Sequence, residues 1–130
     1  MEVTVSQAQG RVPVTIFHVV GAVTTNQELE ARAQAAFDGG ARNILLDLTE
    51  VPYMATAGLR ALHAIFTLLR SDMPEESDAA TKAGIAAGTF VSPHLKLLNP
   101  APYVQEVLKV AGYDMFLEMH RDVNQAVASF

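Results

Sequence analysis

The fold is decided by the segment from Ile44 to Leu62, which reads ILLDLTEVPYMATAGLRAL. Its beginning, residues 44–48, is apolar except for Asp47, and a short run of this kind between polar residues predicts a strand buried on both faces. Its end and the residues that follow carry apolar side chains at helical spacing, namely Leu59, Leu62, Phe66 and Leu69. The segment therefore predicts a central strand, a loop, and a helix with one apolar stripe facing a sheet.

The residues before this segment predict two strands and a helix. Residues 3–5 alternate between apolar and polar side chains, and residues 12–20 are rich in Val, Ile and Phe, so we expect an antiparallel hairpin. Thr25 followed by Glu28 has the capping-box pattern, which predicts Thr25 as the N-cap of a helix that ends at Gly39. A strand, a helix and a buried strand in this order give a parallel strand pair through a right-handed crossover.

The residues after the segment add further elements. Residues 94–99 have strand character, and Pro102 near the first position and Gly112 after the end bracket another helix. Residues 115–119 predict a last short strand, and Asp122 begins a second capping-box pattern before a C-terminal helix.

Together these elements predict an α/β fold. We expect one domain over residues 1–130, with a mixed sheet of about five strands, parallel in its centre, and about four helices. Residues 71–92 interrupt the pattern, because they are first polar and acidic and then rich in small residues. We interpret residues 71–92 as a mobile insert, since a connection of this length without structure is uncommon in a compact domain.

Composition excludes several classes of protein. The chain of 130 residues has a net charge of −5 and no cluster of Lys and Arg, so we expect no nucleic-acid partner. The absence of cysteine excludes a disulfide scaffold and thiol catalysis, and it fits a reducing cytoplasm. The N-terminus has no signal-peptide pattern, and no apolar stretch approaches the roughly 20 residues that span a bilayer, so we expect no direct membrane insertion.

The sequence offers no catalytic constellation. The histidines are scattered along the chain, at His18, His63, His94 and His120. No two of them have the spacing of a helical metal site, and neither a GxSxG elbow nor a phosphate-binding loop is present. Asp47, at the end of a buried strand, is best interpreted as an acceptor for nearby loop amides, although such positions also hold site carboxylates. We therefore expect no enzyme, no cofactor and no metal site.

The start of the helix after the central strand has an unusual composition. Thr56 lies at the N-terminus of this helix and is followed by Ala57 and Gly58. A glycine so early in a helix costs up to about 1 kcal/mol relative to alanine, which indicates close approach of another group. Two interpretations remain open: Thr56 is the N-cap and Gly58 allows close packing on the sheet, or the small residues leave room for a partner.

These residues resemble the signature of the STAS domain, the family that includes anti-sigma factor antagonists. The family typically shows an apolar strand ending in Asp-Leu-Ser/Thr, and then Asp-Ser-Ser/Ala-Gly-Leu opening a helix. This chain has Leu46-Asp47-Leu48-Thr49 followed by Ala55-Thr56-Ala57-Gly58-Leu59. Residues 95–99 and Ala111-Gly112-Tyr113 continue the likeness, which covers nearly all of the chain apart from residues 71–92.

The resemblance implies a regulatory binding protein. In the phospho-regulated members, a Ser or Thr at the position of Thr56 is phosphorylated by a partner that is both anti-sigma factor and serine-threonine kinase, and a phosphatase reverses the modification. The resemblance therefore implies that Thr56 is the phosphoacceptor. The residues that it places at the partner-binding surface are Thr24, Thr25, Asp47, Thr49, Ala55, Ala57, Gly58, Leu59 and Arg60. The loop that holds Thr24 and Thr25 is expected near Thr56, at the same edge of the sheet.

The sequence departs from the family pattern in two places, and other functions stay open. Ala55 stands where the family usually has Asp, and residues 71–92 are longer than the usual connection. These departures suit an alternative, a STAS domain that is not phosphorylated and serves as a scaffold or subunit of a signalling or membrane transport complex. A third hypothesis is a small-molecule or nucleotide site near Asp47, Thr49 and Thr56. A homodimer is also open.

Overall fold

The computed structural model describes residues 1–70 and 92–130. The strands are β1 (Glu2–Gln9), β2 (Pro13–Val20), β3 (Ile44–Glu50), β4 (Leu95–Leu98) and β5 (Met119–His120). The helices are α1 (Gln27–Asp38), α2 (Thr56–Arg70), α4 (Pro102–Val110) and α5 (Val123–Ala128), with a 3₁₀ turn, η1 (Tyr113–Met115). The predicted α/β fold with a mixed sheet is confirmed. The mobile insert expected at residues 71–92 lies outside the described residues, except for Ser92.

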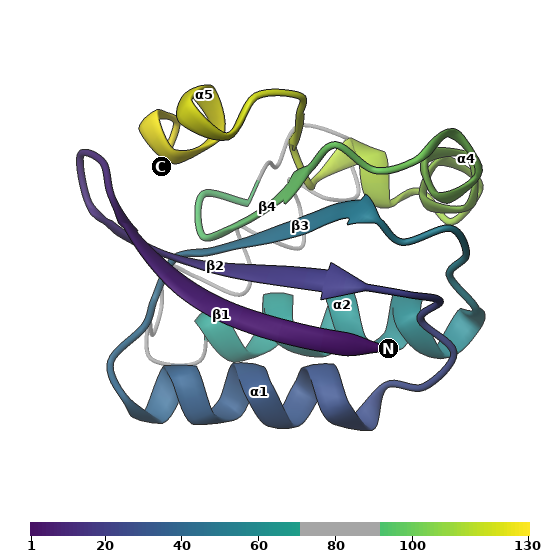
Figure 1. Cartoon of the computed structure of the whole chain (residues 1–130), viewed down its shortest axis with the longest axis horizontal. Coiled ribbons are helices and arrows are strands. Elements are labelled where there is room, and N and C mark those ends of the chain that lie inside the picture. Colours follow the sequence, from purple (N-terminus) through teal and green to yellow (C-terminus); the bar gives the residue numbers. More distant parts are fainter. Residues whose placement is uncertain (71–91) are drawn as a thin grey trace.

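The sheet has the strand order β1-β2-β3-β4-β5 (Figure 1). β1 and β2 form the predicted antiparallel hairpin, whereas the pairs β2–β3, β3–β4 and β4–β5 are parallel. β2 lies between β1 and β3, and α1 makes the crossover that brings β3 parallel to β2, as the strand-helix-strand pattern requires. Both faces of β3 are covered, so Ile44 and Leu46 are buried in the main core on one face and Leu45 in a smaller cluster on the other.

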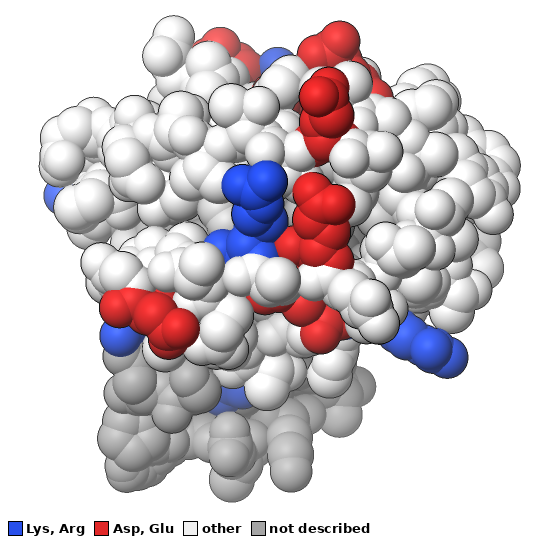
Figure 2. Space-filling model, turned by 60° about the horizontal axis from the view of Figure 1, so that its bottom comes forward, with Lys and Arg blue, Asp and Glu red and all other residues white. Residues whose placement is uncertain are grey.

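Helices α1 and α2 cover one face of the sheet (Figure 1). Their outer surface carries charged side chains, and Figure 2 shows acidic and basic groups lying side by side on this side of the molecule. In the part of the chain that the structure describes, no helix is both long and apolar enough to cross a membrane.

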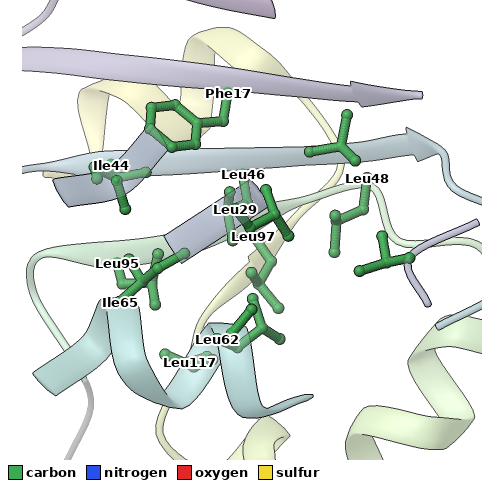
Figure 3. Close-up of a cluster of buried hydrophobic side chains, with 14 of the residues drawn as sticks. Phe17, Leu29, Ile44, Leu46, Leu48, Leu62, Ile65, Leu95, Leu97 and Leu117 are labelled. Carbon is green, nitrogen blue, oxygen red and sulfur yellow. The ribbon is translucent and has the colours of Figure 1, made fainter. Parts of the chain in front are cut away.

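The main hydrophobic core lies between this sheet face and the two helices (Figure 3). The sheet contributes Phe17 and Leu46, and the helices contribute Leu29, Leu62 and Ile65, all with no exposed surface. Burying a side chain of this size stabilises the fold by about 1.5–3 kcal/mol relative to its exposed state. The apolar stripe predicted for the helix after the central strand is therefore the face of α2 that builds the core.

The opposite face of the sheet is partly covered by α5. A smaller cluster forms there from Val14, Leu45, Leu98 and Ala126. Lys96 lies beside it with only 3% of its surface exposed. Its ammonium donates to the Ser129 carbonyl at 2.9 Å and to Ser129 Oγ at 3.0 Å, and it lies 5.0 Å from the centre of the Phe130 ring. These contacts hold the end of the chain against the sheet, since a buried ammonium needs hydrogen-bond partners.

The predicted N-cap of the first helix was wrong by one residue. α1 begins at Gln27 with Asn26 in the capping position, and neither Asn26 nor Thr25 makes a side-chain cap. The Asn26 amide instead donates to Glu30 Oε2 at 2.7 Å, and the Asn26 carbonyl accepts from the Glu30 N–H at 3.1 Å. Thr25 is exposed, and Val23, two residues before it, pairs with Met54 in the loop before α2.

The last strand was also predicted too early. Residues 115–119 contribute only Met119 to β5, because Gly112 has a left-handed conformation (φ 82°) that turns the chain into η1. The Leu117 N–H then donates to the Tyr113 carbonyl at 3.0 Å, and the Phe116 ring packs on the rings of Tyr113 and Phe66. Packing of this aromatic cluster overrides the strand preference of the segment. At the C-terminus, by contrast, Asp122 caps α5 as predicted.

Candidate functional site

Two loops at the carboxyl ends of β2 and β3 are joined by backbone hydrogen bonds. Val23 and Met54 form a parallel bridge between the loop before α1 and the loop before α2. The Val23 N–H donates to the Tyr53 carbonyl at 2.9 Å, and the Ala55 N–H donates to the Val23 carbonyl at 2.9 Å. This pairing places the residues that follow Val23 next to those that follow Met54. The predicted proximity of Thr24 and Thr25 to the start of the second helix is therefore confirmed.

Thr56 is the first residue of α2, and its side chain is exposed. The N–H groups of Gly58 and Leu59 both donate to the Ala55 carbonyl, at 2.8 and 3.4 Å, so they are not capped by the Thr56 hydroxyl. The interpretation of Thr56 as a side-chain N-cap is therefore wrong. In the described residues, no hydrogen bond engages the Thr56 hydroxyl or the backbone N–H groups of Thr56 and Ala57. A hydroxyl and two backbone donors are thus presented together at the positive end of a helix dipole.

Gly58 is buried beneath this surface. A Cβ added to Gly58 would lie 2.5 Å from Met54 Cγ and 3.0 Å from Val23 Cγ1. Both neighbours are buried and belong to the two joined loops. Gly58 therefore permits close packing as predicted, but against the two loops and not against the sheet, and the glycine fixes how closely α2 approaches the bridge.

The remaining predicted partner-binding residues differ in exposure. Thr24, Thr25 and Arg60 are exposed, whereas Ala55, Ala57 and Leu59 are half-buried around Thr56. Leu59, one turn after Thr56, opens onto an apolar groove along α4, whose lining includes Tyr103, Val107, Val110 and Ala111. Tyr103 and Val110 are 54% and 81% exposed, so an unusually apolar surface adjoins the start of α2.

Asp47 and Thr49 belong to a separate polar network on the other face of the sheet. Asp47 Oδ1 accepts from the Thr49 hydroxyl at 2.6 Å and from the Thr49 N–H at 3.1 Å. Its second oxygen, Oδ2, lies 2.8 Å from His18 Nδ1, and His18 Nε2 lies 2.8 Å from Glu50 Oε2. Asp47 therefore accepts from a backbone amide as predicted, but the donor, Thr49, belongs to β3 and not to the loop that follows it. Within the described residues, no hydrogen bond connects this network to Thr56.

The network shifts the titration of two of its members. Hydrogen bonding to Asp47 is the largest cause that raises the pKa of His18, and burial opposes it only in part. Burial acts to raise the pKa of Asp47, but the hydrogen bonds from Thr49 and His18 together outweigh burial and lower that pKa. The network therefore favours the charged form of both groups, the imidazolium of His18 and the carboxylate of Asp47, relative to a free side chain.

Sequence reasoning missed His18, Asn99 and Arg121 as members of this network. Asn99 Nδ2 donates to Thr49 Oγ1 at 3.3 Å, and Arg121 donates to Asn99 Oδ1 at 3.2 Å. Asn99 has a positive φ of 50°, a conformation in which Asn is enriched. The sequence indicated this network only by placing His18 and Asp47 on neighbouring strands. The two side chains meet because the register of β2 and β3 pairs His18 with Asp47.

The site combines a hydroxyl, backbone donors and apolar side chains. Among residues 1–70 and 92–130, no group of three or more His, Cys, Asp or Glu side chains could hold a metal ion. The start of α2 presents an exposed hydroxyl, small neighbouring residues and an adjoining apolar groove. Such a surface can receive a protein partner.

The family of the chain follows from its sequence. The model of the STAS domain matches residues 5–73, more than half of the chain, and the chain therefore belongs to the STAS domain family. It is 26% identical over 130 residues to BtrV of Bordetella bronchiseptica, which is named as a candidate anti-sigma factor antagonist. That alignment covers 100% of this chain and 95% of BtrV.

Solved structures share the fold. An anti-sigma factor antagonist from Mycobacterium paratuberculosis superposes with a TM-score of 0.67 at 15% identity, over 98% of this chain and 93% of that one. The anti-sigma factor antagonist SpoIIAA in its unphosphorylated form gives a TM-score of 0.59 at 13% identity, over 96% and 93%. At these identities the likeness is one of fold.

Proposed function

We propose that this chain is a cytoplasmic, non-enzymatic anti-sigma factor antagonist that acts by binding an anti-sigma factor with serine-threonine kinase activity. The observation that carries the proposal is the exposed Thr56 hydroxyl at the start of α2, beside the loop that holds Thr24 and Thr25. The similarity to BtrV supports the antagonist role. A protein of the same fold, SpoIIAA, was described in its unphosphorylated form, which supports phosphorylation as the form of control.

The proposed switch is phosphoryl transfer to Thr56. Thr56 Oγ1 forms a bond to the γ-phosphorus of ATP while the bond from that phosphorus to the β,γ-bridging oxygen breaks, so ADP leaves and the hydroxyl proton passes to a base of the kinase. A phosphatase reverses the step by adding water across the Oγ1–phosphorus bond, which restores the hydroxyl and releases inorganic phosphate. This chain provides only the acceptor, and the partner provides the catalytic groups.

The surroundings of Thr56 allow a kinase to reach the hydroxyl and allow the fold to tolerate a phosphate there. Ala55 and Ala57 add little bulk beside the hydroxyl, so a kinase can approach it closely. The free N–H groups of Thr56 and Ala57 and the dipole of α2 favour a nearby anion, so phosphorylation need not disturb the fold. Ala55 also lacks the carboxylate usual in the family, which removes a like charge from beside the phosphate.

Phosphorylation changes the affinity of the partner because the phosphate lies within the binding surface. We propose that this surface runs from Thr24 and Thr25 across Thr56 to Leu59, Arg60 and the apolar groove along α4. A phosphate adds a charge of about −1.5 to −2 beside an apolar contact, and this charge must be desolvated or paired when the partner binds. The unmodified chain therefore binds the anti-sigma factor, and the phosphorylated chain is released.

The test compares baits in a pull-down from the lysate of the source cell. Wild-type chain and Thr56→Glu are used in parallel, with Thr67→Glu, an exposed position near the other end of α2, as the matched control. We expect a kinase-type anti-sigma factor to be retained by wild type and Thr67→Glu and lost by Thr56→Glu. Equal capture of the same partners by all three baits contradicts the switch and favours the scaffold or subunit alternative.

A further inference from the structure

The two edges of the sheet are built very differently. β5 closes one edge with only two residues, Met119 and His120, whereas β1 forms the other edge with eight, Glu2–Gln9. In the described residues, β2 is the only strand that pairs with β1. A long edge strand presents a row of unpaired backbone groups that can pair with another chain, and a short one does not.

The hydrogen-bond pattern shows which residues of β1 face outward. The Thr15 N–H donates to the Asn43 carbonyl, on the β3 side of β2. Backbone direction alternates along a strand, so Val14, Ile16 and His18 direct their N–H and C=O groups toward β1. Their register partners Ala8, Ser6 and Thr4 are therefore bonded to β2. The alternate residues Val3, Val5 and Gln7 present their backbone N–H and C=O groups at the outer edge.

β1 lacks the features that normally protect an edge strand. It has no Lys, Arg or Pro, and Glu2 is its only charged residue. Its pairing with β2 is continuous from Glu2–Val20 to Gln9–Pro13, without a bulge. Val5 is 40% exposed although it lies on the same side of the strand as the buried Val3. Natural sheets blunt a free edge with charges, prolines or bulges, so an edge without them is suited to pairing.

We propose that β1 is a homodimer interface, in which β1 of a second copy of this chain adds antiparallel to form one continuous sheet. Antiparallel pairing about a two-fold axis lets Val5 lie opposite Val5 of the second copy, while Val3 lies opposite its Gln7 and Thr4 opposite its Ser6. In this register the helix-facing side of each copy continues that of the other. The outward backbone groups of Val3, Val5 and Gln7 are then all paired.

The charges of β1 favour antiparallel over parallel pairing with β1 of a second copy. Glu2 lies at one end of β1 and the rest of the strand is neutral. Antiparallel pairing puts the two Glu2 carboxylates at opposite ends, roughly 20 Å apart at about 3.3 Å per residue, where salt largely screens them. Parallel pairing would bring them together. The strand is thus complementary to itself when reversed.

The test measures sedimentation of the full chain over a range of concentrations, together with exchange of its backbone amides. We expect reversible dimers, with the amides of Val3, Val5 and Gln7 becoming protected as concentration rises. The amides of Thr4 and Ser6 should be protected at every concentration, because they bond β2. A chain that stays monomeric at all concentrations, or dimers that leave the outward amides unprotected, overturns the proposal.

Matched variants separate the interface from the fold. The outward N–H of Val5 makes Val5→Pro compatible with the hairpin, because an edge strand tolerates proline where its N–H faces solvent. Gln9→Pro lies at the end of the strand, far from the proposed axis, and is the control. We expect Val5→Pro to weaken dimerisation by about tenfold or more and Gln9→Pro to leave it nearly unchanged, with both variants keeping the wild-type circular dichroism. Equal effects of the two prolines on dimerisation contradict the proposed register.

Discussion

Gly58 provides a quantitative test of how the site is held together. Alanine normally improves a helix by up to about 1 kcal/mol relative to glycine. At position 58, however, the added methyl group would lie 2.5 Å from Met54 Cγ, 3.0 Å from Val23 Cγ1 and 3.3 Å from Met54 Sδ. Met54 is 2% exposed and Val23 is fully buried, so neither side chain can move away into solvent.

The balance of these effects predicts a destabilised Gly58→Ala variant. Overpacking a buried site costs about 1–3 kcal/mol, and the improved helix preference offsets up to about 1 kcal/mol of this. The free energy of unfolding should therefore fall by about 1–2 kcal/mol, because the clash exceeds the gain. For a chain of this size we expect the melting temperature to fall by roughly 4–8 °C.

Urea denaturation followed by circular dichroism measures the change, and Gly39→Ala is the matched control. Gly39 has an ordinary φ of −83°, and a Cβ there would lie no closer than 3.5 Å to Ala36 O. We expect Gly39→Ala to unfold at the wild-type urea concentration or above it, and Gly58→Ala to unfold well below it. A Gly58→Ala variant as stable as Gly39→Ala would refute the close contact between α2 and the two loops.

Three further predictions concern other contacts. The pKa of His18 is raised above its ordinary value of 6.5, so its contribution to stability is fully present below about pH 6.5 and is lost as the pH rises through the folded-state pKa. His18→Gln should therefore flatten the fall in melting temperature from about pH 6 to pH 8, and an unchanged pH profile would contradict the ion-pair geometry. Asp122→Ala removes the acceptor for the Gln125 N–H and should cost about 1 kcal/mol, seen as faster amide exchange in α5. Exchange that stays at the wild-type rate would contradict the cap. Tyr113→Phe removes the hydrogen bond to the Leu59 carbonyl at 3.0 Å and should lower the free energy of unfolding by about 0.5–1.5 kcal/mol in urea. Unfolding at the wild-type urea concentration would show that this bond adds nothing.

The fold could be predicted from the sequence because its main elements have strong local signals. The buried run at residues 44–48, the helical stripe from Leu59 to Leu69 and the hairpin pattern before them all agree with the global arrangement. The errors lie where tertiary contacts outweigh local preference. Pairing of Val23 with Met54 fixes the chain before α1, and packing of Phe116 on Phe66 turns residues that have strand character into η1.

The candidate site was predictable only in part. Thr56 and the neighbouring loop follow from motif order, because the carboxyl ends of parallel strands meet at one edge of a sheet. The separation of Asp47 and Thr49 from Thr56 was not predictable, since it depends on which side of β3 each side chain leaves the strand. The His18 network likewise depends on strand register, which no short segment encodes alone.

The most direct test of the proposed function is phosphorylation of Thr56 by the anti-sigma factor. Once the pull-down identifies the kinase-type partner, the purified partner and ATP are incubated with wild-type chain, with Thr56→Ser and with Thr56→Ala, and the modified residue is mapped by mass spectrometry. We predict one added phosphate on wild type and on Thr56→Ser, located at position 56, and none on Thr56→Ala. A partner that binds the wild-type chain but adds no phosphate, or adds it at another residue, would contradict the role of Thr56.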